Sequence, residues 1–296
     1  MKIDNMELNV NSLISEGREY HDVKNLKNIS LVCIETRFVE LALFAIKKST
    51  QNLAFDEIIL FSDKKFDVPD EVTNIIIPPI NSTQEYSEFI VKKLPDYITT
   101  DFILIIQWDG FVINHNLWND DFLKYDYIGA PWGDRPVKVG NGGFSLRSKK
   151  ILLAAQTIVS DNYHPEDRVI CETYQKYLEE SFGVVFAPED LALVFSFEDV
   201  YVDHETFGFH ALYNIAKILN GDELINYISI LPKNILQTRL SRRLIKKLYQ
   251  ERLYKESLYM IKRSIFKSLK SFFKCSVLSV QCAAHFLWHR FIISKL

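Results

Sequence analysis

Residues 101–106 read DFILII and are followed by Gln107, Trp108, Asp109 and Gly110. A short run that is apolar on both faces predicts a central strand buried in a parallel sheet. A carboxylate directly after such a strand can hold a divalent cation against a diphosphate, because Mg²⁺ and Mn²⁺ prefer oxygen ligands. Asp-Gly is also a common turn pair, and on this feature alone the pattern favours a simple turn at Asp109.

The elements around this strand alternate in type. Short apolar, β-branched runs predict strands at residues 29–34, 57–61 and 75–77. Helical spacing of apolar residues predicts helices at residues 38–48 and 82–94. Strands that alternate with helices predict a doubly wound α/β sheet, which binds ligands beyond the carboxyl ends of its strands.

Composition narrows the class of protein. The chain has 296 residues, of which 48% are apolar and 25% are charged, as is typical of a globular protein and not of a disordered or collagen-like one. Its four cysteines lack the CxxC spacing of a structural zinc site and suggest no disulfide framework, which favours a reducing cytosol. The first residues lack the basic and apolar regions of a secretory signal, so we expect a cytoplasmic protein.

Charge divides the chain into unequal parts. Residues 233–296 contain 15 of the 35 basic residues but only two of the 38 acidic ones, which gives this segment +13 and the preceding residues −16. All glycines and prolines lie at or before position 232, so the final segment contains no helix breaker. We therefore predict an N-terminal leader at residues 1–28, an α/β domain at residues 29–232 and a basic amphipathic helical tail at residues 233–296.

Two interpretations of the basic tail remain open. Basic residues combined with an apolar stripe are typical of a helix lying on an anionic membrane, here through residues 233–274. An annex packed on the domain, with its lysines reaching water, fits the same pattern nearly as well. The apolar stripe argues against nucleic-acid binding. Polar residues interrupt residues 276–293, so no transmembrane helix is predicted there.

Two motifs rich in aromatic residues or glycine follow the central strand. Residues 125–132 (YDYIGAPW) are typical of a packed pocket wall. Residues 139–148 (VGNGGFSLRS) contain three glycines in four positions, which lets the backbone approach a ligand closely. This loop has neither the GK[ST] of a P-loop nor the GxGxxG of a dinucleotide site, so by itself it is weak evidence.

Two further motifs carry titratable groups. Glu166 and Asp167 precede a helix predicted at residues 168–180, where a carboxylate either is stabilised by the helix dipole or acts as a general base. His210 follows the turn FGF and is either a satisfied core residue or a nitrogen ligand of an ion at Asp109.

Taken in order, these motifs resemble DUF5672, a family of bacterial and viral sugar-transfer domains whose proteins look like nucleotide-sugar glycosyltransferases of the GT-A fold. The resemblance covers roughly residues 29–215 and implies a GT-A-like, Rossmann-like sheet that is mixed, mostly parallel and flanked by helices. It rests on the stretches LVCIETR (31–37), FILIIQWDGFVIN (102–114), YDYIGAPW (125–132), VGNGGFSLRSKK (139–150), HPEDRVIC (164–171), FAPEDLALVFSFE (186–198) and FGFHALYN (207–214).

The resemblance also implies roles for particular residues. One carboxylate of the Glu166-Asp167 pair would be the catalytic base, with Asp167 favoured, and Asp109 and His210 would bind Mn²⁺ or Mg²⁺. Gln107 stands where GT-A enzymes carry the first Asp of their DxD motif. The nucleotide-sugar site would comprise Glu35, Thr36, Arg37, Asp63, Gln107, Trp108 and Asp109. The donor sugar and acceptor would be lined by Trp132, Asn141, Gly142, Gly143, Phe144 and Ser145.

The resulting hypothesis is a hexosyltransferase-like enzyme of the EC 2.4 class. It would move a sugar from a nucleotide sugar, with a UDP-sugar favoured, to a glycan or lipid-linked acceptor in surface polysaccharide synthesis. We expect the reaction to depend on a metal and to invert the configuration at the anomeric carbon, and a retaining reaction stays open. The alternative is a non-catalytic nucleotide- or sugar-binding module with the same fold. Gln107 favours this alternative, whereas the presence of Asp109, Glu166, Asp167 and His210 together argues against it.

Overall fold

The computed structural model describes residues 23–264 except 134, 136 and 201, together with residues 277, 280, 281 and 284. The predicted leader therefore lies outside the described residues up to position 22. The tail beyond residue 264 also lies outside them, apart from those four positions. The first strand begins at Lys24, so the boundary predicted at residue 28 falls inside it.

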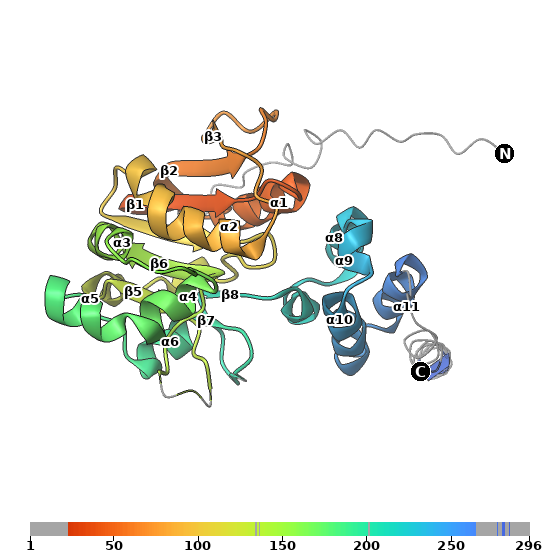
Figure 1. Ribbon diagram of the computed structural model, residues 1–296. Helices are drawn as coiled ribbons and strands as arrows, with labels where there is room; N and C mark the ends of the chain where they lie inside the picture. The colour runs from red at the N-terminus through yellow and green to blue at the C-terminus, as the bar shows by residue number, and fades with distance from the viewer. Residues whose placement is uncertain are drawn as a thin grey trace.

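A six-stranded sheet forms the centre of the fold (Figure 1), in the order β3-β2-β1-β4-β6-β5. From β3 to β4 all neighbours pair in parallel, whereas β6 is antiparallel to both β4 and β5. The predicted fold class, a mixed and mostly parallel sheet flanked by helices, is confirmed. The strands are β1 (Lys24–Ile34), β2 (Leu53–Ser62), β3 (Val72–Ile76), β4 (Phe102–Ile106), β5 (Tyr127–Gly129) and β6 (Phe144–Ser148), and a separate pair joins β7 (Ser196–Phe197) to β8 (Gly208–Phe209).

The helices follow the predicted pattern with shifted ends. The helix predicted at residues 82–94 is α2 followed by a π-helical segment at Phe89–Lys93. The helix predicted at residues 168–180 is likewise divided, by a π-helical segment at Val169–Thr173. The α-helices are α1 (Val39–Thr50), α2 (Thr83–Glu88), α3 (Lys149–Gln156), α4 (Glu166–Arg168), α5 (Gln175–Phe182), α6 (Glu189–Phe195), α7 (Ile215–Ile218), α8 (Gly221–Ile230), α9 (Lys233–Leu236), α10 (Arg239–Gln250) and α11 (Tyr254–Arg263).

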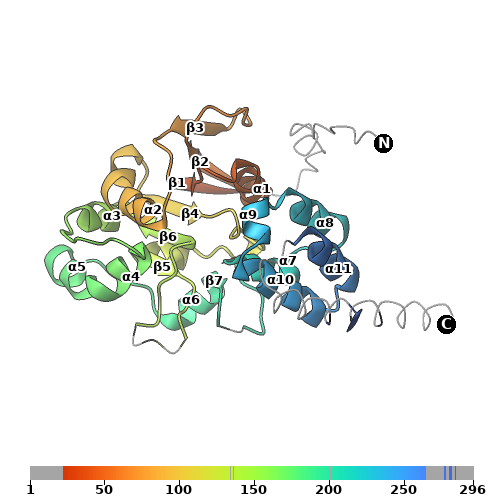
Figure 2. The same ribbon diagram turned by 45° about the vertical axis from the view of Figure 1, so that its right-hand side comes forward.

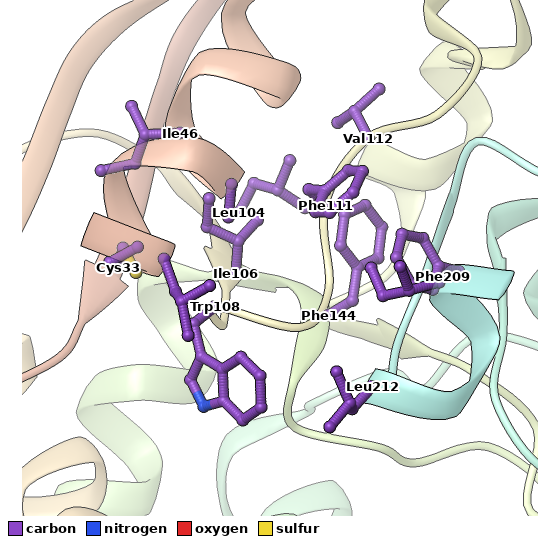
Figure 3. Packing of buried hydrophobic residues seen from close by; sticks show 14 of the residues in the cluster. Cys33, Ile46, Leu104, Ile106, Trp108, Phe111, Val112, Phe144, Phe209 and Leu212 are labelled. Atoms are coloured by element: carbon purple, nitrogen blue, oxygen red, sulfur yellow. The ribbon is translucent and has the colours of Figure 1, made fainter. Parts of the chain in front are cut away.

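Both faces of the central strands are buried. Along β4, Leu104 and Ile106 pack into one hydrophobic cluster together with α1, while Ile103 and Ile105 pack into another with Ile90 of the π-helical segment after α2. Burial on both faces explains why this strand is apolar throughout. Figure 3 shows part of the first cluster, in which side chains from β4, β6 and β8 meet.

The described part of the predicted tail packs against the domain. Leu244, Ile245 and Leu248 of α10 and Met260 of α11 are fully buried, in the same cluster as the sheet. Helices α8 to α11 gather beside the sheet in both views (Figures 1 and 2). We call α9 to α11 the annex. Because its apolar stripe is buried in the core that it shares with the domain, this part of the chain follows the packed-annex interpretation.

The outer face of α10 remains basic. Arg239, Arg243 and Lys246 are exposed, and the helix contains no acidic residue. None of the helices in the described part of the chain combines the length and hydropathy needed to span a bilayer.

Candidate active site

The sheet order reverses between β1 and β4, because β2 and β3 continue on one side and β6 and β5 on the other. In open α/β sheets, ligands bind outside the carboxyl ends of the strands at such a point. Two cavities lie here and share the side chain of Gln107. The large cavity has a volume of about 300 Å³ and the small cavity one of about 130 Å³. The large one is at the lower end of the range for small-molecule sites.

The small cavity is lined by the residues after β1. Glu35 is only 6% exposed, and its Oε1 accepts the backbone N–H groups of Arg37 (2.7 Å) and Phe38 (3.1 Å). Burial raises the pKa of the Glu35 carboxyl above its usual range. This carboxylate therefore stabilises the turn into α1 while forming one wall of the cavity.

The other residues predicted to bind the nucleotide do not all lie in the small cavity. Thr36 and Arg37 line the small cavity, and Thr36 Oγ1 accepts the N–H of Ile80 at 3.1 Å. Trp108 lines it as well. Asp63 follows β2 but lines neither of the two cavities.

His210 is the centre of a hydrogen-bonded group at the end of β4. Its Nε2 lies 3.1 Å from Gln107 Oε1 and 3.5 Å from Asp109 Oδ1, and its Nδ1 lies 3.1 Å from Glu198 Oε1. Burial lowers the pKa of His210, but the charges of Asp109 and Glu198 outweigh it and raise the pKa well above its usual range. The second oxygen of Asp109 accepts the N–H of Leu212 at 3.0 Å.

A divalent cation bound at this group would have His210, Gln107 and Asp109 as its candidate ligands. Neighbouring ligands of an octahedral Mg²⁺ lie about 3 Å apart, since each is about 2.1 Å from the ion. The distances from Nε2 to the oxygens of Gln107 and Asp109 are close to that separation. Glu198 at Nδ1 supplies the carboxylate that commonly orients a histidine ligand. In the described part of the chain no group of three or more His, Cys, Asp or Glu side chains is arranged for a metal, so a cation at Asp109 and His210 would need the amide oxygen of Gln107 as a further ligand.

Asn141 connects the glycine-rich loop to this group. Its backbone has φ = 59°, and its Nδ2 donates to Glu198 Oε2 at 2.5 Å. Its Oδ1 accepts the N–H of Phe144 at 3.3 Å. Asparagine tolerates the left-handed conformation because its side chain bonds locally to the backbone.

Two glycines of the loop lie so close to neighbouring side chains that a Cβ would not fit at either position. A Cβ at Gly142 would lie 2.0 Å from Glu166 Oε1, and one at Gly143 would lie 2.1 Å from His210 Nε2. Any larger residue would displace these side chains. The Gly-Gly pair thus lets the loop pass directly over the titratable groups.

Glu166 forms a buried ion pair. Its Oε1 lies 3.0 Å from Nη2 of Arg147, which is completely buried on β6. Nε of Arg147 donates to Ser145 Oγ at 3.0 Å, whereas Nη1 has no hydrogen-bond partner among the described residues. Removing either charge would leave the other buried and unpaired.

Asp167 lies beside Glu166 but has no such basic partner in the described part of the chain. Its oxygens accept the N–H groups of Gly142 (3.1 Å) and Arg168 (2.8 Å). Burial, followed by the negative charge of Glu166, raises the pKa of Asp167 to about 6. A carboxylate with a pKa near neutrality is suited to accept a proton.

The large cavity brings together most of the residues predicted for catalysis and for the donor and acceptor. It is lined by Gln107, Trp132, Asn141, Gly142, Gly143, Glu166, Asp167 and His210. Phe144 and Ser145 do not reach it, because both are completely buried beneath the loop. Figure 3 shows Phe144 among core side chains. Asp109 is 7% exposed and lines neither cavity, and its Oδ1 lies 3.5 Å from Nε2 of His210.

Among the residues of this region that sequence reasoning missed, three contact predicted site residues. Glu198 contacts His210, Arg147 pairs with Glu166, and the hydroxyl of Tyr86 accepts a hydrogen bond from Gln107 Nε2 at 2.8 Å. Arg147 and Glu198 lie inside motifs that carried the resemblance, Arg147 within β6 and Glu198 directly after β7, so a charge in or beside a short strand was the available signal. Tyr86 had no comparable signal, since it occupies an ordinary helical position.

Residues 71–210 match the model of the family described as "Protein of unknown function (DUF5672)". The resemblance to this family that the motifs predicted is therefore confirmed. The matched segment extends from β3 to His210 and includes every predicted site residue except Glu35, Thr36, Arg37 and Asp63.

One solved structure similar to this chain is the mannosyltransferase PcManGT from Pyrobaculum calidifontis, in complex with GDP-Man and Mn²⁺. The likeness covers 95% of this chain and 93% of that one, with 9% sequence identity and a TM-score of 0.39. At these values the likeness carries no argument about activity. No curated protein matches the chain.

Proposed function

We propose that the protein is a glycosyltransferase that moves a sugar from a nucleoside-diphosphate sugar to an acceptor hydroxyl. The observation that carries this proposal is Asp167, a carboxylate with a pKa of about 6 in a cavity at the switch point of the sheet. The match to DUF5672 supports it, since that family resembles nucleotide-sugar glycosyltransferases.

In this proposal Asp167 is the base and Glu166 is not. A base must be free to take a proton, and Glu166 is tied to Arg147 in a buried ion pair. Asp167 accepts only backbone N–H bonds, and a proton on it relieves the repulsion from Glu166. It would take the proton of the acceptor hydroxyl as that oxygen attacks the anomeric carbon. Attack from the face opposite the leaving group gives the inversion that we expect.

The donor would extend across both cavities. The nucleotide, with uridine favoured, would lie in the small cavity, and the sugar would lie in the large one beyond Gln107. Gln107, Asp109 and His210 would hold Mn²⁺ or Mg²⁺, which stabilises the charge of a leaving diphosphate as a Lewis acid. Glu198 would orient His210 in that set.

The acceptor would be a glycan or a lipid-linked glycan used in surface polysaccharide synthesis. The exposed basic side chains on α10 would bring the enzyme to an anionic membrane where such acceptors gather. Sedimentation with vesicles of phosphatidylglycerol at low and high salt tests this part. Binding that does not weaken as salt rises would contradict it.

A screen of nucleotide sugars by thermal shift, with Mn²⁺ present, tests the donor. The hit is then assayed for transfer and for hydrolysis with and without EDTA. We expect turnover that EDTA abolishes and Mn²⁺ restores, and Asp109→Asn should lose the Mn²⁺-dependent gain in donor binding. Tight donor binding without any turnover would instead favour the non-catalytic binding module. Full activity in Asp109→Asn would contradict the proposed cation site.

A further inference from the structure

Two guanidinium groups lie at the mouth of the large cavity. Arg135 and Arg168 both line it, and their side chains are 41% and 48% exposed. The charged groups deeper in the cavity are much less exposed, at 15% for His210 and 7% for Glu166. The two arginines therefore stand between the inner cavity and the solvent.

Both guanidinium groups converge on one carboxylate oxygen. Nε of Arg168 lies 2.8 Å from Oε2 of Glu172, and Nη1 of Arg135 lies 3.5 Å from the same atom. The hydrogen bond from Arg168 lowers the pKa of Glu172, so this carboxylate is ionised at neutral pH. The position of that oxygen marks a point where the two arginines can hold an anion together.

Arg135 is oriented by an aromatic ring. Its guanidinium carbon lies 5.0 Å from the centre of the Trp132 ring. Trp132 is itself held against Gly140, where a Cβ would lie 2.1 Å from the indole. A guanidinium that rests on an aromatic face keeps its N–H donors at the edge of its plane, where they can reach a ligand.

The acidic groups of the cavity wall and the two arginines at its mouth are paired differently. In the described part of the chain, three acidic groups of the wall form ion pairs, whereas Asp167 has no basic partner and His210 also lies 3.5 Å from Asp109. These pairs are Glu166 with Arg147, Glu198 with His210 and Asp199 with Arg243. Arg135 and Arg168, in contrast, share the single carboxylate of Glu172.

We propose that Arg135 and Arg168 bind an anionic group of the acceptor, a phosphate or a carboxylate, while the reacting hydroxyl lies at Asp167. This inference rests on the proposed function and specifies the substrate class of that site. Arg168 directly follows Asp167 in the chain, and both residues line the large cavity. The small cavity, which would hold the nucleotide, is lined by neither arginine.

Binding of three simple probes to the full-length protein tests the proposal. Glucose 6-phosphate, glucuronate and neutral glucose are titrated in turn by calorimetry, with UDP and Mn²⁺ at saturation. We expect the two anionic probes to bind at least about tenfold more tightly than glucose, because charge-assisted bonds to guanidinium groups are strong. Arg135→Gln and Arg168→Gln should each reduce that preference, and the double variant should abolish it.

Two further variants sharpen this test. Lys65→Gln, an exposed position in the loop after β2, removes the same charge elsewhere on the surface and should leave the preference unchanged. Glu172→Gln should strengthen binding of both anionic probes severalfold, because it removes the carboxylate that competes for the two arginines. Arg168→Lys keeps the charge but not the paired N–H geometry, and should retain only part of the preference.

Three results would overturn the acceptor site. These are equal binding of glucose and the anionic probes, an unchanged preference in the double variant, and competition between the probes and UDP, which would assign the anion to the donor. Binding and turnover of the donor are measured separately on the same proteins. Their absence in the wild-type protein contradicts the proposed function, whereas normal turnover without an anion preference contradicts only this inference.

Discussion

The small and the large cavity use their carboxylates differently. In the small cavity, Glu35 accepts two backbone N–H groups and so stabilises the start of α1. In the large cavity, Asp167 also accepts two backbone N–H groups, but it lies beside Glu166, and its pKa is raised to about 6. A buried carboxylate thus supports the fold in the small cavity, and in the large cavity it is the proposed proton acceptor. Burial raises the pKa of both carboxyls; the charge of Arg37 opposes this rise at Glu35, whereas the charge of Glu166 adds to it at Asp167.

The largest expected effect concerns the annex, which reaches the large cavity through the ion pair of Arg243 with Asp199. Deleting residues 233–296 removes four fully buried apolar side chains, Leu244, Ile245, Leu248 and Met260. Each contributes roughly 1.5–3 kcal/mol by burial, against a total stability of about 5–15 kcal/mol. We expect an insoluble or unfolded protein by circular dichroism.

Deletion of residues 265–296 is the control, because it keeps every residue of the annex. A soluble, folded protein lacking residues 233–296 that still binds a nucleotide sugar would show that the large cavity does not depend on the annex. It would also favour a separate membrane-binding tail.

The second prediction concerns the proton acceptor itself. Asp167→Asn should lower kcat by about 10²–10⁴, the usual contribution of a general base, with little change in donor affinity. Steady-state kinetics with the donor found in the screen measures both quantities. The matched control is Asp190→Asn, the same change at an exposed position of α6. Wild-type turnover in Asp167→Asn would mean that Asp167 only accepts backbone N–H groups, as Glu35 does in the small cavity.

The third prediction separates the two neighbouring carboxylates. Glu166→Gln leaves Arg147 buried without its ionic partner and should destabilise the protein by about 3–5 kcal/mol. Asp167→Asn breaks no ion pair and should cost far less. Denaturant unfolding of both variants at pH 7 measures the contrast. Equal free energies of unfolding for the two variants would contradict the assigned division of roles.

The fourth prediction concerns pH. Because Asp167 must be ionised to act, kcat/KM should fall about tenfold per pH unit below its pKa, which is about 6. The same raised pKa means that the folded state holds this proton more tightly than the unfolded chain does. The contribution of this proton to the free energy of unfolding is fully present below about pH 4, and it is lost as pH rises through about 6. The free energy of unfolding of Asp167→Asn, measured between pH 4 and 8, should not show this loss.

The smallest expected effect lies in the small cavity. Glu35→Ala removes an acceptor from two N–H groups at the start of α1 and should cost about 0.5–2 kcal/mol, as loss of a helix cap does. Glu35→Gln should cost less, since the amide oxygen can still accept. Thermal unfolding of both variants measures the difference. A loss in Glu35→Gln as large as in Glu166→Gln would mean that the charge of Glu35 is needed as well.

The sequence by itself determined the elements and their order. Apolar runs such as residues 101–106 predict buried strands because a central strand has no polar face, and β4 occupies Phe102–Ile106. The glycine-rich loop predicts a backbone that approaches a ligand closely, and in the structure Gly142 and Gly143 lie against Glu166 and His210 of the cavity wall. These features depend on local periodicity and on the size of single residues, which a sequence states directly.

Only the tertiary structure decided which charges meet. Arg147 neutralises Glu166, Glu198 orients His210, and Gln107 contacts His210 across 103 positions of the chain. The burial of Phe144, predicted to line the site, and the packing of α10 on the domain were decided in the same way. Such contacts depend on how strands and helices far apart in sequence are brought together. A pKa responds to the charges and burial around the group, so the contrast between Glu166 and Asp167 exists only in the folded chain.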